Sequence, residues 1–201
     1  MDVSVCVGTF GDESWIETAK RAVASVPNDV PVIHQHSKTL SEARNAALAE
    51  AQTEWVVFLD ADDELEPGYF DAMFSGTADV RGPIARYMVE GRERNIWQPR
   101  VWGHKHDCTA DCLPDGNWLL VGAMVRTEIA RAAGGWHEYP VYEDWDFWLR
   151  CWKAGATLEL IPAAIYRAHV RNDSRNRGPS QAAKNMAHRA IYEANFGAEA
   201  A

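Results

Sequence analysis

Short apolar runs alternate with amphipathic stretches through the first third of the chain, an arrangement typical of proteins that alternate strands and helices. Alternation of polar and apolar positions predicts a strand over residues 2–7, and a second short strand is predicted over 30–34. Residues 55–59 are apolar throughout, which predicts a third strand covered on both faces. The pattern favours an α/β, Rossmann-like fold with a mixed, mainly parallel sheet flanked by helices.

Two helices are predicted between these strands. Ser14 with Glu17, and Thr39 with Glu42, have the spacing of a capping box, in which two side chains satisfy backbone N–H groups at the start of a helix. The second helix is expected to continue to about residue 51. Its apolar face is mostly alanine, so this helix can lie close against the sheet.

The rest of the chain is less regular. Its pattern predicts strands at 84–89, 95–97, 119–125, 157–161 and 164–168, a polar loop at 103–116, a short helix capped by Thr127, and helices at 143–154 and 180–195. The residues expected to be buried in the last two helices are Trp145, Trp148, Leu149 and Trp152, and then Met186, Ala190 and Ala194.

Composition limits the class of protein. A chain of 201 residues and 22.5 kDa has room for one sizeable core, so a single domain is expected. Its apolar runs are far shorter than the roughly 20 residues needed to span a bilayer, and its N-terminus lacks the basic and apolar regions of a secretion signal. These features predict a cytoplasmic protein with mostly reduced cysteines and no membrane span. The net charge of −9 disfavours nonspecific binding to nucleic acid.

Four carboxylates follow the predicted strand 55–59 directly: Asp60, Asp62, Asp63 and Glu64. Open α/β sheets bind ligands at the carboxyl ends of their strands. Carboxylates spaced by one residue are hard ligands that can share Mg²⁺ or Mn²⁺ and leave positions for phosphate oxygens. The alternative is a solvated acidic loop, so a metal carrying a diphosphate is predicted only if other segments agree with this motif.

Two other stretches, and the residues on either side of the motif, do agree. The segments VSVCVGTFGDESWIETAKRAVASV, LSEARNAALAEAQTEWVVFLDADDELEPGYF and AAGGWHEYPVYEDWDFWLRCWKAGATLELIPAAIYRAHVRNDS resemble, in this order, the successive landmarks of family-2 glycosyltransferases with the GT-A fold. The resemblance implies a metal-dependent enzyme that moves a sugar from a nucleoside-diphosphate sugar to a hydroxyl acceptor.

The resemblance also implies roles for residues in the first third of the chain. Thr9 and Phe10 would border the nucleotide, and Arg44 would reach the base or the phosphates. Asp60 would meet the ribose, and Asp62 would meet the metal, expected to be Mn²⁺ or Mg²⁺.

Further roles follow for the second half of the chain. The acidic pair Glu143 and Asp144, which opens a predicted helix, corresponds to the family's catalytic base, and His169 to a residue that can complete the metal site. If Asp144 takes the acceptor proton in a single displacement, the sugar is inverted; retention is the alternative. Arg171 lies in a basic segment that either clamps the leaving diphosphate or is merely solvated. The single domain of residues 1–201 is expected to contain a nucleotide- and metal-binding half at 1–66, an acceptor and catalytic half at 67–170, and a basic segment with the last helix at 171–201.

The chain departs from the family in one place. Family members usually carry an Asp-Asp-Gly-Ser turn, a helix and a further strand before the arginine helix, and this unit is missing or collapsed here. His34 and His36 stand where a base-reading aspartate is expected, so no uracil preference is inferred. The two histidines either contact the base or are ordinary polar residues at a strand end. The acceptor stays open among a glycan, a protein, a small molecule and a modified nucleic-acid base.

Two other classes of protein fit parts of the sequence. A noncatalytic sugar-nucleotide or glycan-binding module would share the fold and the motifs, and donor turnover distinguishes it from an enzyme. A haloacid-dehalogenase-type phosphatase also has an Asp-x-Asp after a strand, but it leaves Arg44 and the pair Glu143 and Asp144 without a role.

The polar loop contains residue types that zinc binds, at a spacing unlike the usual paired zinc ligands. The residues are His104, His106, Cys108 and Cys112. A loop that borders the acceptor is the alternative to a zinc site.

Overall fold

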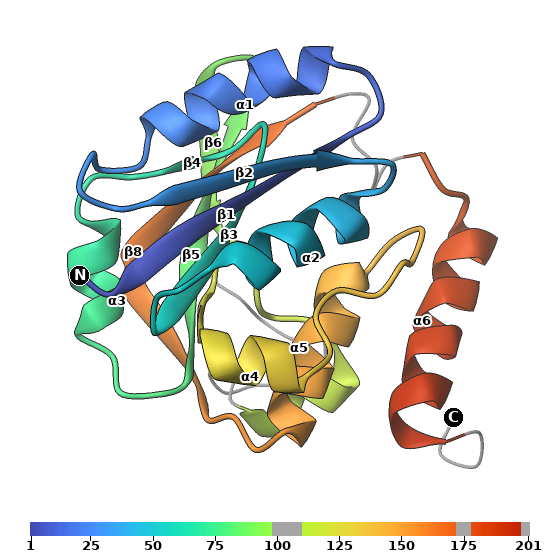
Figure 1. The fold of residues 1–201 in the computed structure, drawn as a ribbon. Helices are drawn as coiled ribbons and strands as arrows, with labels where there is room; N and C mark the ends of the chain where they lie inside the picture. Colours follow the sequence, from blue (N-terminus) through green and yellow to red (C-terminus); the bar gives the residue numbers. More distant parts are fainter. Residues whose placement is uncertain (98–109, 172–177, 198–201) are drawn as a thin grey trace.

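The structure is a computed structural model that describes residues 1–97, 110–171 and 178–197. Its strands form one mixed sheet with helices on both faces (Figure 1). The strands are β1 (Val3–Phe10), β2 (Val32–Ser37), β3 (Trp55–Asp60), β4 (Glu64–Leu65), β5 (Val80–Val89), β6 (Arg92–Trp97), β7 (Met124–Arg126) and β8 (Leu158–Val170). The helices are α1 (Ser14–Ala24), α2 (Leu40–Glu50), α3 (Tyr69–Phe74), the 3-10 helix η1 (Ala110–Asp115), α4 (Thr127–Ala132), α5 (Glu143–Lys153) and α6 (Gln181–Phe196).

The order of strands in the sheet is β2-β1-β3-β7-β5-β8-β4, and β6 also pairs with β5. β1 pairs parallel with β2 and β3, and β5 pairs parallel with β8, whereas β4, β6 and β7 pair antiparallel with their neighbours. β7 joins the two parallel groups because it pairs with both β3 and β5. The predicted α/β fold with a mixed sheet is confirmed, and one sheet runs through both expected halves.

Alternating residues of β1 and β3 contribute to two separate cores. Val5 and Val57 pack on the side covered by α1 and α3, and Cys6 and Phe58 pack on the side covered by α2, α4 and α5. Figure 1 shows α1 on one side of the sheet and α2 and α4 on the other. The strand predicted at 55–59 is therefore covered on both faces, as its continuous apolar run indicated.

The two predicted capping boxes have different outcomes. At α2 the box is confirmed, because Thr39 Oγ1 accepts from the N–H of Glu42 and Glu42 Oε2 accepts from the N–H of Thr39. At α1 the prediction is wrong. There Asp12 Oδ1 accepts from the N–H of Ser14 (2.8 Å), and Glu13 takes the N-cap position without a side-chain bond.

Strand boundaries in the second half also differ from the predictions. β7 uses only the end of the apolar run 119–125, because Leu119 packs in the core from a loop instead of pairing with a strand. The two strands predicted at 157–161 and 164–168 are one strand, β8, which begins at Leu158 and whose register against β5 is irregular. β2 begins and ends later than the predicted range 30–34, and β5 begins earlier than the predicted range 84–89.

The segment before α4 shows two further differences. The described part of the predicted loop 103–116 contains η1, and the rest lies outside the described residues. Thr127 starts α4 without capping it, because its hydroxyl donates to the carbonyl of Thr53 (2.8 Å).

Helix α6 packs with a face that differs from the predicted one. Its buried residues are Ala187, Ile191 and Asn195. The predicted core residues Met186, Ala190 and Ala194 are exposed. Apolar residues lie on both faces of this helix, so periodicity alone does not choose between them. Contacts with α5 decide the face: Asn195 Nδ2 donates to Asp146 Oδ1 (3.0 Å), and the ring of His188 stacks on Trp145 at 4.6 Å.

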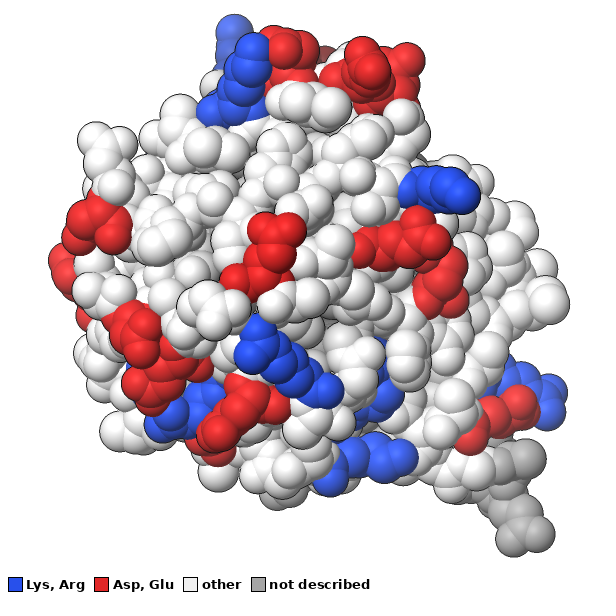
Figure 2. Space-filling view, viewed as in Figure 1, with Lys and Arg blue, Asp and Glu red and all other residues white. Residues whose placement is uncertain are grey.

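The face of the molecule seen in Figure 1 is largely uncharged, with positive and negative side chains interspersed over it (Figure 2). None of the helices in the described ranges combines the length and the apolar character that crossing a membrane requires.

Candidate active site

A buried arginine connects elements from both halves of the chain at the carboxyl end of β3. Arg44 on α2 donates from Nη2 to Asp60 Oδ1 (2.5 Å), and from Nη1 to Glu143 Oε1 (3.1 Å) at the start of α5. Its side chain is 2% exposed, and its guanidinium lies 4.1 Å from the ring centre of Trp136. The predicted contact of Arg44 with the nucleotide stays a prediction, since these partners all belong to the protein.

Close packing fixes the position of this arginine. Gly8 of β1 lets α2 approach, because a Cβ there would lie 3.1 Å from Arg44 Cγ. The next residue, Asn45, accepts from the N–H of Trp136 (2.7 Å) and donates to its carbonyl (2.9 Å). Gly135 has φ of 71°, and a Cβ at this position would lie 2.3 Å from Asn45 Oδ1. The aromatic ring beneath the guanidinium is therefore held through its own backbone.

Asp144 lies beside this bridge, and the hydrogen bonds described for it come from uncharged donors. Its Oδ1 accepts from the N–H of Trp145 (2.9 Å) and its Oδ2 from the amide of Asn117 (2.8 Å). Burial, and after it the charge of Glu143, raise the pKa of Asp144 to about 7. A carboxyl group with this pKa can accept or release a proton near neutral pH. The neighbouring acid Glu143 differs because the cation of Arg44 binds its carboxylate.

The acidic turn, which we define as the segment with Asp62, Asp63 and Glu64 after β3, is held in place partly by the side chain of Asp63. Asp63 is buried, and its Oδ2 accepts from the hydroxyl of Tyr166 (2.7 Å). Its Oδ1 accepts from the backbone N–H of His169 (2.7 Å), so this side chain ties the turn to β8. Burial, and then the charges of Asp60 and Asp62, raise the pKa of Asp63 well above its usual range.

Asp62, in the same turn, has the properties expected of a carboxylate that binds a cation. It is half-buried, and burial followed by the charge of Asp60 raises its pKa to about 6. The positive charges of Arg171 and Arg21 oppose this rise. Because its ionised form is disfavoured, a cation near Asp62 would lower the free energy of the carboxylate.

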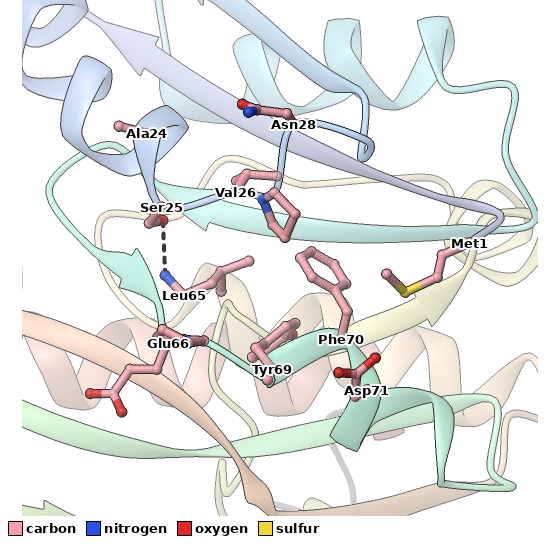
Figure 3. Close-up of a pocket in the computed structure, with 13 residues that line it drawn as sticks. Met1, Ala24, Ser25, Val26, Asn28, Leu65, Glu66, Tyr69, Phe70 and Asp71 are labelled. Carbon is pink, nitrogen blue, oxygen red and sulfur yellow. Dashed lines mark hydrogen bonds between the residues drawn. The ribbon is translucent and has the colours of Figure 1, made fainter.

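Helix α1 holds the acidic turn from one side. Arg21 Nη2 donates to the carbonyl of Asp62 (2.5 Å), and its Nε lies 3.0 Å from Glu64 Oε1. Directly after the helix, Ser25 Oγ accepts from the N–H of Leu65 (3.0 Å), the bond drawn in Figure 3. Arg21 was not predicted as a site residue, because nothing in the local pattern of an exposed helical arginine indicates its partner.

A hollow of about 350 Å³ lies next to the bond between Ser25 and Leu65 (Figure 3). The end of α1, the segment after β4 and the start of α3 line it, and its walls include Val26, Phe70 and Met1. None of the predicted site residues lines this hollow, so it is separate from the carboxylates described above.

His169 lies near the end of β8, beside the acidic turn. Its Nε2 is 3.1 Å from Glu64 Oε1, and burial, followed by the charge of Arg21, lowers its pKa. Within the described part of the chain, no group of three or more His, Cys, Asp or Glu side chains is arranged to hold a metal ion. Binding of a metal by Asp62 and His169 stays a prediction.

The ends of β1 and β2 carry the predicted nucleotide residues. Thr9 is buried, and its hydroxyl oxygen lies 2.9 Å from His34 Nε2 and 3.0 Å from His36 Nδ1. Burial, and after it the charge of His36, lower the pKa of His34. His36 is exposed and Phe10 is half-buried. Contacts of Thr9, Phe10 and the histidines with a nucleotide stay predictions.

The remaining predicted residues are distributed as follows. The guanidinium of Arg171 lies over the ring of Trp15 on α1, at 4.9 Å. Its contact with a diphosphate stays a prediction. Of the residues considered for zinc, Cys112 is buried, and the others, at positions 104, 106 and 108, lie outside the described residues.

The predicted acids therefore form two groups. Asp60, Glu143 and Asp144 gather around Arg44, and Asp62 lies in the acidic turn, which His169 contacts through Asp63 and Glu64. Asp60 lies near both groups, since its negative charge raises the pKa of Asp62 in one group and of Asp144 in the other.

Comparison with known families identifies the class of protein. A model described as glycosyl transferase family group 2 matches residues 55–177, more than half of the chain. The chain belongs to this family, and the resemblance seen in its motifs is confirmed.

Comparison with individual proteins agrees. The pre-mycofactocin glycosyltransferase of Mycobacterium tuberculosis is 29% identical over 154 residues, which cover 68% of this chain and 32% of that protein. The chain thus spans about a third of the length of this relative.

Solved structures share the fold. A structure of S. aureus TarS residues 1–349 in complex with UDP-GlcNAc has a TM-score of 0.68 and 16% identity, covering all of this chain and 69% of that one. The same protein in complex with UDP has a TM-score of 0.63 and 17% identity, covering 95% of this chain and 64% of that one. The predicted GT-A fold is confirmed.

Proposed function

We propose that this protein transfers a sugar from a nucleoside-diphosphate sugar to a hydroxyl acceptor, with a divalent cation, Mn²⁺ or Mg²⁺, and with inversion at the sugar. One observation carries the proposal: Asp144, whose pKa is raised to about 7, lies near Asp60, which ends β3, and near Arg44, which binds Asp60. Membership in glycosyl transferase family group 2 supports it. So does the likeness to TarS, whose structures contain UDP-GlcNAc and UDP.

In the proposed reaction Asp144 takes the proton of the attacking hydroxyl. The hydroxyl oxygen bonds to the anomeric carbon while the bond from that carbon to the diphosphate breaks, and a single displacement of this kind inverts the sugar. The start of α5 favours the ionised carboxylate, and burial opposes it, which leaves the pKa near neutral pH. Glu143 is less suited to this role, because its carboxylate binds Arg44.

A divalent cation, when bound, would neutralise the negative charge that develops on the leaving diphosphate. Asp62 fits such a cation, because burial and Asp60 disfavour its ionised form in the absence of positive charge. One or two carboxylates suffice for Mg²⁺ when phosphate oxygens complete its coordination. His169 could join only by exchanging Glu64 for the cation or by using its other ring nitrogen.

The nucleotide is proposed to lie at the carboxyl ends of β1 and β3. There Asp60 would accept a hydrogen bond from the ribose, since its side chain is 32% exposed despite its bond to Arg44. Thr9 and Phe10 end β1 next to this position. Arg171, held over Trp15, would contact the diphosphate.

A thermal-shift screen of nucleoside diphosphates and their sugars, each with and without Mn²⁺, tests donor binding. A ligand at 100 times its dissociation constant adds about 2.7 kcal/mol of stability, which is readily measured. Donor turnover is then followed for the ligands that bind. Binding without turnover in any acceptor mixture would favour the noncatalytic binding module, and the absence of any shift would contradict the proposal.

Asp62→Asn is expected to abolish the Mn²⁺ dependence of nucleotide binding, because an amide does not replace a carboxylate as a ligand for a hard cation. Since the pKa of Asp62 is raised to about 6, the ionised carboxylate destabilises the folded state above that pH, and the destabilisation is lost as the pH falls toward 4. The variant should therefore be about 1–2 kcal/mol more stable than the wild type at pH 8. Calorimetry and urea unfolding measure the two effects.

A suitable control is Asp71→Asn, which removes an exposed acid on α3 beside the separate hollow. It should change neither quantity. Unaltered Mn²⁺-dependent binding in Asp62→Asn would contradict the assignment of the metal.

A further inference from the structure

Asn117 lies in the loop between η1 and β7, and its amide contacts Asp144 from outside α5. We infer that Asn117 is a positioning residue, which fixes the carboxylate of Asp144 and favours its ionised form for proton transfer. The role of Asn117 in proton transfer rests on the proposed function, in which Asp144 is the base. The contact between Asn117 and Asp144 does not depend on that function.

The orientation of the Asn117 amide is determined by two contacts. Its Oδ1 accepts from the backbone N–H of Leu119 (3.1 Å), and its Nδ2 donates to Asp144 Oδ2 (2.8 Å). Rotating the amide by half a turn would place an NH₂ group against the N–H of Leu119 and an oxygen against the carboxylate. Both contacts would then be unfavourable, so a donor faces Asp144.

The helix η1, which precedes the loop that carries Asn117, is also anchored on α5. Trp145, the residue after Asp144, donates from its indole Nε1 to the carbonyl of Leu113 (2.8 Å). The ring of Trp145 is buried and also stacks on His188 of α6. Two adjacent residues of α5 therefore hold Leu113 in η1 and Asn117 in the loop that follows η1, which keeps the amide in place without an added ligand.

Each oxygen of the Asp144 carboxylate thus has one donor of its own. The N–H of Trp145 binds Oδ1 and the amide of Asn117 binds Oδ2, so rotation of the carboxylate about its Cβ–Cγ bond breaks both hydrogen bonds. Lone pairs remain on both oxygens, and one of them can accept the proton of an acceptor hydroxyl.

The hydrogen bond from the amide of Asn117 also favours the ionised form of Asp144, and so opposes the groups that disfavour its ionisation. Burial and the negative charges of Glu143 and Asp60 disfavour ionisation, whereas the backbone N–H of Trp145 and the charge of Arg44 favour it. A hydrogen bond to the ionised form acts in the same direction as Arg44. Loss of this bond should therefore keep Asp144 protonated to a higher pH.

Two substitutions at position 117 separate the effect of the amide donor on the ionisation of Asp144 from the contact that Asn117 makes with Leu119 in its own loop. Asn117→Asp keeps an oxygen for the N–H of Leu119 but replaces the donor facing Asp144 with a second acid, and Asn117→Ala removes both contacts. In Asn117→Ala the acid limb of the kcat profile is expected to move up by about one pH unit, a roughly tenfold loss of kcat at pH 6, and in Asn117→Asp by more. The KM for donor should change less than about threefold, because donor affinity does not depend on the state of the base.

Trp145→Phe provides the matched control, since it loosens η1 at Leu113, just before the loop that carries Asn117, without removing a donor from Asp144. Its acid limb should stay at the wild-type pH even if kcat falls. Equal displacement of the limb in Trp145→Phe and Asn117→Ala, or no displacement in either Asn117 variant, would overturn the inference.

A second measurement does not require activity. A carboxyl group whose pKa is higher in the folded state than in the unfolded state makes stability fall as the pH rises toward the folded-state pKa. In Asn117→Ala this fall should continue about one pH unit further than in the wild type, as measured by urea unfolding between pH 5 and pH 9. In an Asp144→Asn background the same substitution should leave the pH dependence unchanged.

The two measurements distinguish the possible failures. A displaced titration in a protein that transfers no sugar under any condition would overturn the proposed function and leave the contact between Asn117 and Asp144 established. Sugar transfer with an undisplaced titration and an undisplaced acid limb would overturn the role of Asn117 and leave the proposed function intact.

Discussion

Asp144→Asn is expected to lower sugar transfer by roughly 10² to 10⁴, the usual contribution of a general base. The amide has nearly the same shape and can still accept from the N–H of Trp145, but it cannot take a proton from the acceptor hydroxyl. The measurement is kcat at pH 8, where most of the wild-type group, with its pKa near 7, is ionised. Donor affinity, measured by calorimetry, should persist, because the donor is proposed to bind through Asp60 and Asp62.

Asp71→Asn serves as the control for the loss of one negative charge, since Asp71 is exposed and lines the separate hollow. It should retain wild-type kcat. The product of the wild-type reaction should have the opposite anomeric configuration to the donor, as determined by NMR. Near-normal kcat in Asp144→Asn, or a product with the donor's configuration, would contradict the assignment of Asp144 as the base of an inverting reaction.

The first half of the fold could be predicted from the sequence because its local signals agree with its packing. The run 55–59 is apolar at every position and is covered on both faces, and the capping box of Thr39 and Glu42 forms as its spacing indicates. Where a helix has apolar residues on two faces, the sequence alone does not determine which face is buried. Helix α6 has apolar side chains on two faces, and polar contacts with α5, such as that of Asn195 with Asp146, select one of them.

The acidic residues of the site could be predicted from the sequence, but the residues that bind these acids could not. Asp60, Asp62 and Asp144 follow local motifs at the end of a strand or the start of a helix, which a resemblance to a family can align. Asn117 and Arg21 contact these acids from 27 and 41 residues away, and neither stands in a local pattern that signals its partner. Such pairs depend on the register of packed elements, which single-sequence periodicity does not specify.

Arg44→Met is expected to lower the free energy of unfolding by about 3 kcal/mol, the largest effect on stability among the substitutions considered. The substitution keeps an apolar stem against Trp136 but removes the cation between Asp60 and Glu143, leaving two carboxylates without their partner. The Glu143 side chain is only 9% exposed, so water cannot replace the lost bond fully. The loss should be greater at pH 8 than at pH 6, because Asp144 ionises between them and Arg44 no longer stabilises its charge.

Urea unfolding of Arg44→Met beside Lys20→Met tests this expectation. Lys20 forms an ion pair with Glu17 in which both side chains are 70% exposed, and exposed pairs of this kind contribute at most about 1 kcal/mol. Arg44→Lys should recover part of the stability, since it restores the charge but cannot bind both acids with a planar fork. If Arg44→Met is as stable as the wild type and loses only donor affinity, Arg44 acts as a ligand of the nucleotide and not as the bridge between β3 and α5. A large loss of stability at pH 8 that shrinks at pH 6 would instead show that the site is held together by this one buried cation.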